Sequence, residues 1–338
     1  DWSTPTGGYT YDRRLALALR DMGWAVAPLV LEGAWPWPDR TDLAAASARI
    51  AALPDGARVV ADGLAFGALA EVVQPHARRL RWVALVHHPL HLETGLDPSD
   101  SARLRVGEAR ALQLAQQVVV TSPSTAGDVL VMGVPLARIA VVEPGTDAPP
   151  ARPAQPRPDG PLQLLCVATL TPRKGHAVLL QALAGLTHLP WVLHLVGSGE
   201  RDPGTTARLQ AMAREFGERV VWHGEIAGAA LFAHYTAADV FVLPSLYEGY
   251  GMVVAEAVAH GLPVVTTDGG ALARTLPPAA GLQVPAGDVV ALQAALERVL
   301  NDAALRARLA AGARAAAAGL PTWPQQAARF AAVLEGVA

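Results

Sequence analysis

Hydrophobic positions along the chain fall into short continuous runs that alternate with longer stretches of helical periodicity. In the first half, the short strand-like runs occupy residues 57–61, 81–86, 117–121 and 139–142. Helical spacing marks residues 11–22, 102–116 and 124–132. Buried runs separated by helices are typical of parallel sheets that are covered on both faces.

The second half of the chain repeats this pattern with more strands. Its strand-like runs are residues 162–167, 191–196, 220–222, 240–243, 263–266 and 281–284. Its helical stretches are residues 174–186, 205–216, 229–235, 252–260 and 288–300. The two series predict an α/β fold with two facing doubly wound, Rossmann-like domains and a ligand-binding cleft at the carboxyl ends of their strands.

A proline-dense segment without periodicity separates the two series and indicates an interdomain linker. We predict an N-terminal domain over residues 1–147, a linker over 148–161, a C-terminal domain over 162–320, and a last helix within 321–338 that crosses back to the first domain. Only four residues precede the glycine turn at residues 5–9, so we expect the first domain to lack its opening strand.

Composition narrows the classes of partner and the compartment. The 338 residues are 51% hydrophobic and carry a net charge of −3, which excludes nucleic acid as the main partner. No apolar run is long enough to span a membrane, and no signal-peptide pattern opens the chain. The lone Cys166 lies in an apolar run and fits a reducing, cytoplasmic location. The basic segment 74–81 leaves peripheral contact with the inner membrane face open, although a solvated basic patch is favoured.

Residues 243–265 hold the most informative motif. An apolar strand leads through a glycine-rich loop, containing Gly249 and Tyr250, into a helix. The amides of Gly251, Met252 and Val253 at the start of this helix would form a seat for a phosphate, helped by the helix dipole.

Two carboxylates, Glu248 and Glu256, bracket this turn with seven residues between them. Eight residues of helix span about 12 Å. Glycosidases place their paired carboxylates only about 5–9.5 Å apart. The spacing therefore favours two separate contacts with one extended ligand, whose phosphates would lie between the two carboxylates.

This segment resembles the signature of family 4 glycosyltransferases, in which two glutamates seven residues apart lie in a Pro-Ser-x-x-Glu-Gly-x-Gly context. The resemblance extends from about Gly7 to Trp323. It implies the GT-B fold, a nucleotide-sugar donor bound by the C-terminal domain, and transfer with retention at the anomeric carbon. By this resemblance Glu248 would contact hydroxyls of the transferred sugar, and Glu256 would bind the ribose hydroxyls.

A second family-like segment covers residues 169–176 and contains Arg173 and Lys174, the only lysine of the chain. Cations at the end of a strand would offset the charge that develops on a leaving diphosphate. The family usually has an arginine where this chain has Thr169. Arg173 would take over its role.

A third segment, residues 86–91, resembles the His-x-Pro motif of the family's N-terminal domain and places His87 near the donor phosphate and the acceptor. His87, His88, His91 and Glu93 also lie close enough in sequence to consider a metal. Their spacing does not complete a tight ligand pattern.

Weaker family-like pieces complete the expected donor site. Gly7 and Gly8 would let the backbone approach the donor phosphates or the acceptor. Gly197 lies in the loop that would line the base pocket, and Glu225 lies in the segment whose backbone would read the base.

No Asp-x-Asp occurs in the sequence, although glycosyltransferases that hold Mg²⁺ or Mn²⁺ on the diphosphate usually need such carboxylates. We therefore predict a metal-independent hexosyltransferase without a cofactor. No side chain is an obvious covalent nucleophile. We expect front-side attack, with the departing phosphate taking the proton of the acceptor.

The resemblance implies a UDP- or GDP-linked hexose and leaves the acceptor open among sugars, lipid-linked compounds and small molecules. Two functions other than glycosyl transfer remain open. A non-catalytic nucleotide-sugar-binding protein is favoured by Thr169, and a nucleotide-sugar 2-epimerase would use the same fold. A glycoside phosphorylase would need a lysine-bound pyridoxal cofactor, but the only lysine is already assigned.

Overall fold

The computed structural model describes residues 6–149 and 160–337. The chain divides into two compact units. The first unit comprises Asp1–Gly145 and Pro321–Ala338, and the second comprises Thr146–Leu320. Most of the linker expected at residues 148–161 lies outside the described residues.

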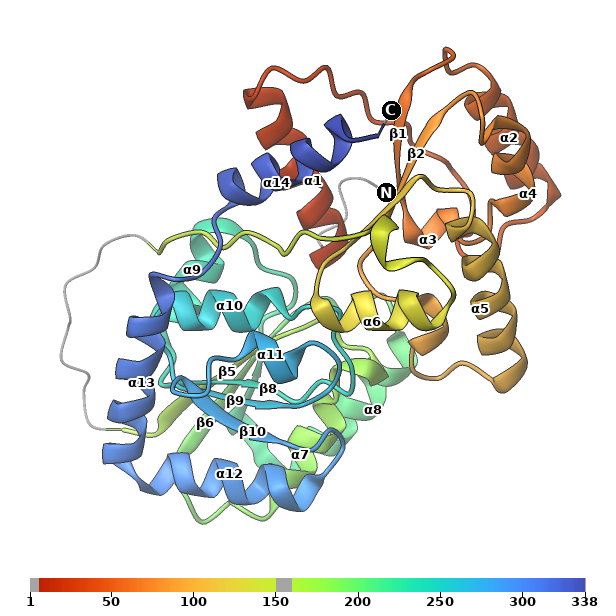
Figure 1. Ribbon diagram of the computed structural model, residues 1–338. Helices are drawn as coiled ribbons and strands as arrows, with labels where there is room; N and C mark the ends of the chain where they lie inside the picture. Colours follow the sequence, from red (N-terminus) through yellow and green to blue (C-terminus); the bar gives the residue numbers. More distant parts are fainter. Residues whose placement is uncertain (1–5, 150–159, 338) are drawn as a thin grey trace. The chain divides into compact units, whose positions relative to one another are not determined.

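The first unit is built on a four-stranded parallel sheet with strand order β1-β2-β3-β4 (Figure 1). Its central strand β2 (Arg81–Val86) is buried along almost its whole length, as an apolar run between two helical layers should be. The remaining strands are β1 (Arg58–Asp62), β3 (Gln117–Val120) and β4 (Ile139–Val141). The helices are α1 (Gly7–Asp21), α2 (Arg40–Ala51), α3 (Gly63–Phe66), α4 (Ala70–Val73), α5 (Pro98–Leu112) and α6 (Pro123–Val131). Short 3₁₀ turns lie at Gln74–His76, Leu90–Leu92 and Leu136–Arg138.

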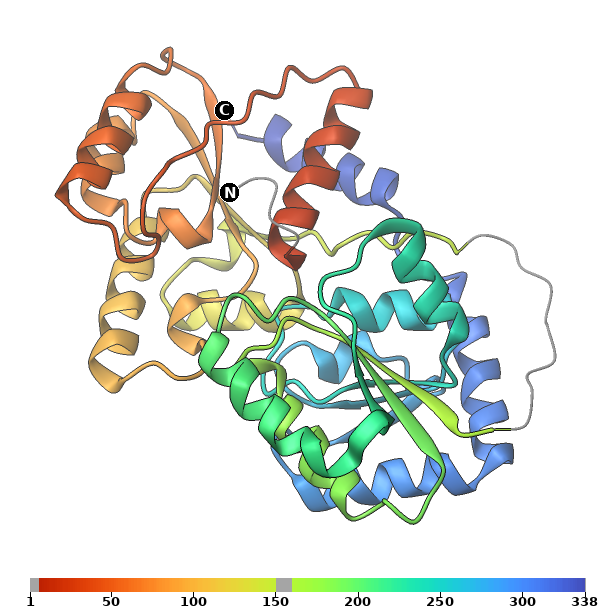
Figure 2. The same cartoon turned by 180° about the vertical axis from the view of Figure 1, so that it is seen from behind.

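No strand precedes α1 in this unit among the residues from 6 onward, and residues 1–5 lie outside the described part. The helix α14 (Trp323–Glu335) packs beside α1 in both views (Figures 1 and 2). The rings of Tyr11 and Trp323 meet edge to face at 6.0 Å, and the guanidinium of Arg14 lies 4.9 Å from the Trp323 ring. The end of the chain therefore completes the first unit.

The second unit is a six-stranded parallel sheet with the order β10-β9-β8-β5-β6-β7. Its strands are β5 (Leu162–Val167), β6 (Trp191–Val196), β7 (Val220–Trp222), β8 (Val240–Leu243), β9 (Val264–Thr267) and β10 (Gly281–Val284). Its helices are α7 (His176–Ala184), α8 (Pro203–Ala213), α9 (Gly228–Ala237), α10 (Met252–Ala259), α11 (Leu272–Thr275), α12 (Val289–Asn301) and α13 (Ala303–Ala317). 3₁₀ turns lie at Pro172–Lys174 and Arg214–Arg219.

Helices cover both faces of this sheet, with α9 and α10 on one side and α7 and α12 on the other (Figure 1). Strands β8 and β9 are buried at every position, because apolar side chains point into both helical layers. The predicted fold class, α/β with two parallel-sheet domains, is confirmed, and the strand order of the second sheet reverses between β5 and β8 as in a doubly wound fold. No helix of the described residues is long and apolar enough to cross a membrane.

Several helices differ from the prediction, and α5 and α2 show how polar caps mark where a helix begins. Helix α5 begins at Pro98, before the expected residue 102, since the Asp97 side chain accepts from the amide of Asp100. Helix α2 was not predicted. Asp39 and Asp42 form a reciprocal capping box at its start, a signal that the sequence carried.

Candidate active site

Two loops meet where β5 and β8, which are neighbours in the sheet of the second unit, end. The 3₁₀ turn Pro172–Lys174 follows β5, and its last residue is succeeded by Gly175, which has a φ of +69°. A Cβ at Gly175 would collide with the backbone carbonyl of Pro244 after β8. The amide of Leu246 donates to the carbonyl of Arg173 at 2.7 Å. Glycine thus lets the two loops lie in direct contact.

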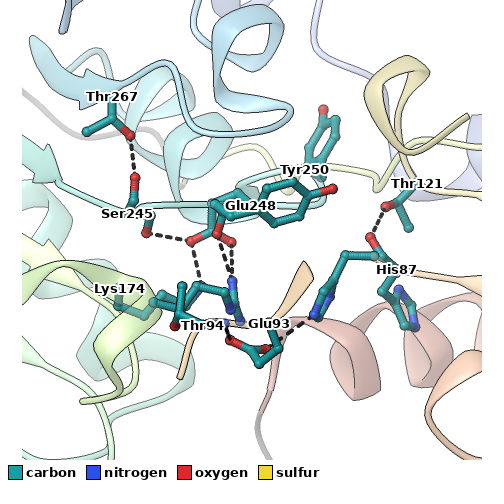
Figure 3. Close-up of polar contacts among 12 residues, drawn as sticks. His87, Glu93, Thr94, Thr121, Lys174, Ser245, Glu248, Tyr250 and Thr267 are labelled. Carbon is teal, nitrogen blue, oxygen red and sulfur yellow. Dashed lines mark hydrogen bonds and ion pairs between the residues drawn. The ribbon is translucent and has the colours of Figure 1, made fainter. Parts of the chain in front are cut away.

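The contact between these loops brings Glu248 together with Lys174 (Figure 3) and also with Arg173. The Lys174 ammonium donates to one carboxylate oxygen of Glu248 at 2.6 Å, and the Ser245 hydroxyl donates to the same oxygen at 2.6 Å. The guanidinium of Arg173 lies 3.5 Å from the other oxygen and donates to the carbonyl of Tyr247 at 2.9 Å. The sequence separates Lys174 and Glu248 by 74 residues, and the sheet order brings them together.

The charges around Glu248 determine the protonation state of its carboxyl group. Glu248 is buried, and burial by itself would raise its pKa. The Lys174 ammonium, followed by the Arg173 guanidinium, outweighs burial and lowers the pKa of Glu248 to about 2. Lys174 and Arg173 thus lie beside an ionised carboxylate at the strand ends.

The start of α10 is the second part of the predicted donor site. Gly251 caps the helix with a φ of +90°, and a Cβ there would lie 2.6 Å from the side chain of Leu272. Gly249 is buried and Tyr250 is half-buried in the loop before it. The amides of Met252 and Val253 belong to the first turn, where no helical carbonyl is available to them. The helix therefore begins at Met252, where the sequence predicted it.

Glu256 lies one turn further along α10 and is held by a residue that the sequence analysis missed. The Tyr235 hydroxyl, from α9, donates to one Glu256 oxygen at 2.7 Å. Burial, and then the neighbouring Glu256 carboxylate, raises the pKa of Tyr235 well above its usual value, so the phenol remains a donor. No local motif marks Tyr235, because it precedes Glu256 by 21 residues on another helix.

Gly197 and Glu225 lie just after the neighbouring strands β6 and β7. The amide of Gly197 donates to the carbonyl of Gly224 at 2.7 Å, which fastens the two loops together. The side chain of Glu225 is exposed. These two predicted positions therefore share the edge of the sheet that carries the strand ends.

The first unit holds a separate group of predicted residues around His87, which follows β2. Its Nε2 lies 3.0 Å from a carboxylate oxygen of Asp12, a residue of α1 that was not predicted. Burial would lower the pKa of His87, but Asp12 and then Asp62 outweigh it and raise the pKa above 6.5. Gly8 lies against the imidazole, since a Cβ there would be 3.1 Å from the ring. Gly7 is the first residue of the same helix.

The four residues considered from the sequence as metal ligands, His87, His88, His91 and Glu93, do not form one cluster in the described part of the chain. His88 pairs with Glu93 at 3.3 Å, and His91 pairs with Glu108 at 3.2 Å, apart from the contact of His87 with Asp12. By distance, two other groups could hold an ion in the described part of the chain. They are Asp12, Asp62 and His87 in the first unit, and His194, His223 and His234 in the second.

Comparison with known proteins agrees with the family resemblance found in the sequence. The sequence profile described as "Glycosyl transferases group 1" matches residues 147–316, which contain all the second-unit residues described above. The D-inositol 3-phosphate glycosyltransferase of Xylanimonas cellulosilytica is 34% identical over 266 residues, which are 70% of this chain and 63% of that protein. The GDP-mannose-dependent alpha-(1-6)-phosphatidylinositol monomannoside mannosyltransferase of Mycolicibacterium smegmatis is 35% identical over 185 residues.

This alignment covers 51% of the present chain and 47% of the mannosyltransferase. The chain therefore spans less than two thirds of either relative. Among solved structures, sucrose-phosphate synthase from Thermosynechococcus elongatus superposes with a TM-score of 0.78 at 25% identity. This superposition covers 98% of the present chain and 93% of the synthase chain.

Proposed function

Because the chain belongs to the glycosyl transferases group 1 family, we propose that it is a retaining, metal-independent glycosyltransferase that takes a hexose from a UDP- or GDP-sugar. The observation that carries the proposal is the contact of Glu248 with Lys174 and Arg173 beside the first turn of α10. A nucleotide diphosphate needs positive charge and amide donors, and this edge of the second unit offers both.

Within this proposal the two cations have different tasks. The Lys174 ammonium, 17% exposed, offsets the charge that builds on the diphosphate as the glycosidic bond breaks. Arg173 is bound to the carbonyl of Tyr247 and close to Glu248, so it holds the loop in place as well as adding charge. It stands in for the arginine that the family has where this chain has Thr169. The carboxylate of Glu248 accepts from hydroxyls of the transferred sugar.

Glu256 is proposed to bind the ribose. A carboxylate can accept from two vicinal hydroxyls when its plane is fixed. The bond from the buried Tyr235 fixes one oxygen and so orients the group. The amides of Gly251, Met252 and Val253 then receive the phosphates between the two glutamates.

His87 is proposed to donate a hydrogen bond to the reacting groups, as the family resemblance implies. Against the effect of burial, Asp12 and then Asp62 raise the pKa of His87, which extends the pH range over which the imidazole is protonated. In front-side transfer the departing phosphate accepts the proton of the acceptor hydroxyl, so His87 positions the participants. No nucleophilic side chain is required for this course.

We infer the class of acceptor from the acceptors of two relatives. One is a glycosyltransferase of D-inositol 3-phosphate, and another acts on a phosphatidylinositol monomannoside. We propose a hydroxyl of an inositol phosphate or of a phosphatidylinositol headgroup as the acceptor to test first. A lipid-linked acceptor would place the protein peripherally at a membrane face.

The test is transfer from UDP-glucose or GDP-mannose to inositol phosphate or to phosphatidylinositol vesicles, in excess EDTA, with the anomeric configuration of the product read by NMR. We expect a retained product without added metal, and a loss of about 100-fold or more in kcat for Lys174→Ala. An inverted product, or activity that EDTA abolishes and Mn²⁺ restores, would contradict the proposal.

The same assay separates the competing functions. Thr169 in place of the family's arginine favours a nucleotide-sugar-binding protein without catalysis. Saturable donor binding with no turnover across the acceptors would support that function. Release of an altered free sugar without an acceptor would instead indicate a 2-epimerase.

A further inference from the structure

We propose that the second unit carries a zinc site formed by His194, His223 and His234. The three residues come from different elements. His194 lies in β6, His223 directly follows β7, and His234 lies in α9. None of them has a task in the proposed glycosyl transfer, so the site does not depend on that function.

The rings already lie close to a coordinating arrangement. One ring nitrogen from each side chain lies within 4.8 Å of the other two. The Nδ1 of His194 and the Nε2 of His223 are 2.9 Å apart, and the His223 and His234 ring centroids are 4.4 Å apart. Nitrogens bound to one tetrahedral Zn²⁺ at 2.0–2.1 Å would be about 3.3 Å from each other. The nitrogens of His194 and His223 would have to move apart by about 0.4 Å, and a His234 nitrogen already lies within 4.8 Å of both.

Gln163 fixes the tautomer that a metal ligand needs. Its amide nitrogen donates to the carbonyl of Pro161 at 2.7 Å, which turns the amide oxygen toward His194. That oxygen lies 2.7 Å from Nε2 of His194 and can only accept. The Nε2 of His194 therefore carries the proton, and its Nδ1 lone pair faces His223. A metal-binding histidine whose second nitrogen donates to an outer acceptor is the usual arrangement around zinc.

The cluster is accessible from solvent. All three side chains are half-buried, which leaves a route for the ion and a fourth position for water.

Binding would connect β6, the end of β7 and α9. In the metal-free protein the bond from Nε2 of His223 to Nδ1 of His194 already joins two of these elements. Removal of the ion should therefore leave the second unit folded. When zinc binds, the proton on Nε2 of His223 moves to its Nδ1, so that Nε2 can coordinate. Imidazole ligands of this kind suit Zn²⁺ among the available divalent ions.

The experiment is calorimetric titration of ZnCl₂ into the chain, free of affinity histidines and dialysed against EDTA and then buffer, with Co²⁺ absorption as a second readout. We expect saturable binding of one ion and visible bands typical of tetrahedral cobalt. His234→Ala and His223→Ala should each weaken binding by at least tenfold, and Gln163→Leu by about 10–100-fold. His188→Ala, an exposed histidine of the same unit, is the matched control and should bind as the wild type does.

Circular dichroism of each variant shows whether it is folded, and the two histidine variants on different elements guard against loss through misfolding of one. No saturable binding up to about 100 μM zinc would overturn the site. Wild-type affinity in both His234→Ala and His223→Ala would also overturn it, because the ion would then be bound elsewhere in the chain.

Discussion

Replacing Lys174 with methionine tests the electrostatic account of the candidate site. The change keeps the length of the side chain and removes the charge that lies 2.6 Å from Glu248. Against the effect of burial, Lys174, followed by Arg173 and Ser245, lowers the pKa of Glu248 from 4.5 to about 2, which corresponds to about 3 kcal/mol of stabilisation of the folded state in all. Arg173 and Ser245 stay in the variant, so we expect Lys174→Met to lose up to about 3 kcal/mol in the free energy of unfolding at pH 7.

The pH dependence follows from the sign of the shift. Because the folded-state pKa of Glu248 is lowered, its stabilisation is present above pH 4.5 and is lost as the pH falls towards 2. The stability difference between wild type and Lys174→Met should therefore narrow below pH 4.5. Near neutral pH it should stay constant.

The assay is urea unfolding of wild type, Lys174→Met, Glu248→Gln and the double variant. Lys174→Met leaves the buried Glu248 carboxylate with less positive charge around it. Glu248→Gln removes the charge of that carboxylate. The double variant should therefore recover at least about 1 kcal/mol relative to Lys174→Met alone. A Lys174→Met protein as stable as the wild type, or strictly additive losses in the double variant, would refute the reasoning.

Three further predictions concern other parts of the two units. Tyr235→Phe removes the bond to Glu256 and should weaken nucleotide binding by about 3–10-fold by calorimetry, whereas unchanged affinity would deny the orienting role. Asp12→Asn should lower the pKa of His87. The stabilisation from their contact, present below pH 6.5 and lost as the pH rises past the folded-state value, should disappear from melting curves recorded against pH. Gly175→Ala should destabilise the second unit by more than about 2 kcal/mol in urea unfolding, because of its φ of +69° and the carbonyl beside it.

The strands were predictable because most of them are buried on both faces and therefore appear as unbroken apolar runs. Strands β2, β5 and β6 have the bounds expected from the sequence. Helix α2 was missed because few of its residues are buried, and its apolar periodicity is correspondingly weak. The capping box at Asp39 and Asp42 was its clearest signal.

The residue types of the site were predictable, but most of their pairings were not. Lys174 follows β5 and Glu248 follows β8, yet β6 and β7 intervene in the chain between these two strands. Only the sheet order, in which β5 lies beside β8, brings them into contact. Asp12 was missed because it lies 75 residues from His87, and no local pattern in α1 marks it as the partner of that histidine.

The central claim is that the second unit binds the nucleotide of a sugar donor through Glu256 and the start of α10. The most direct test is calorimetric titration of UDP, GDP and ADP into wild type and Glu256→Gln in EDTA. The account predicts that one diphosphate binds the wild type and that the substitution weakens its affinity by at least about tenfold, which is 1.4 kcal/mol. Failure of all three nucleotides to bind the wild type, or equal affinity of the two proteins, would contradict it.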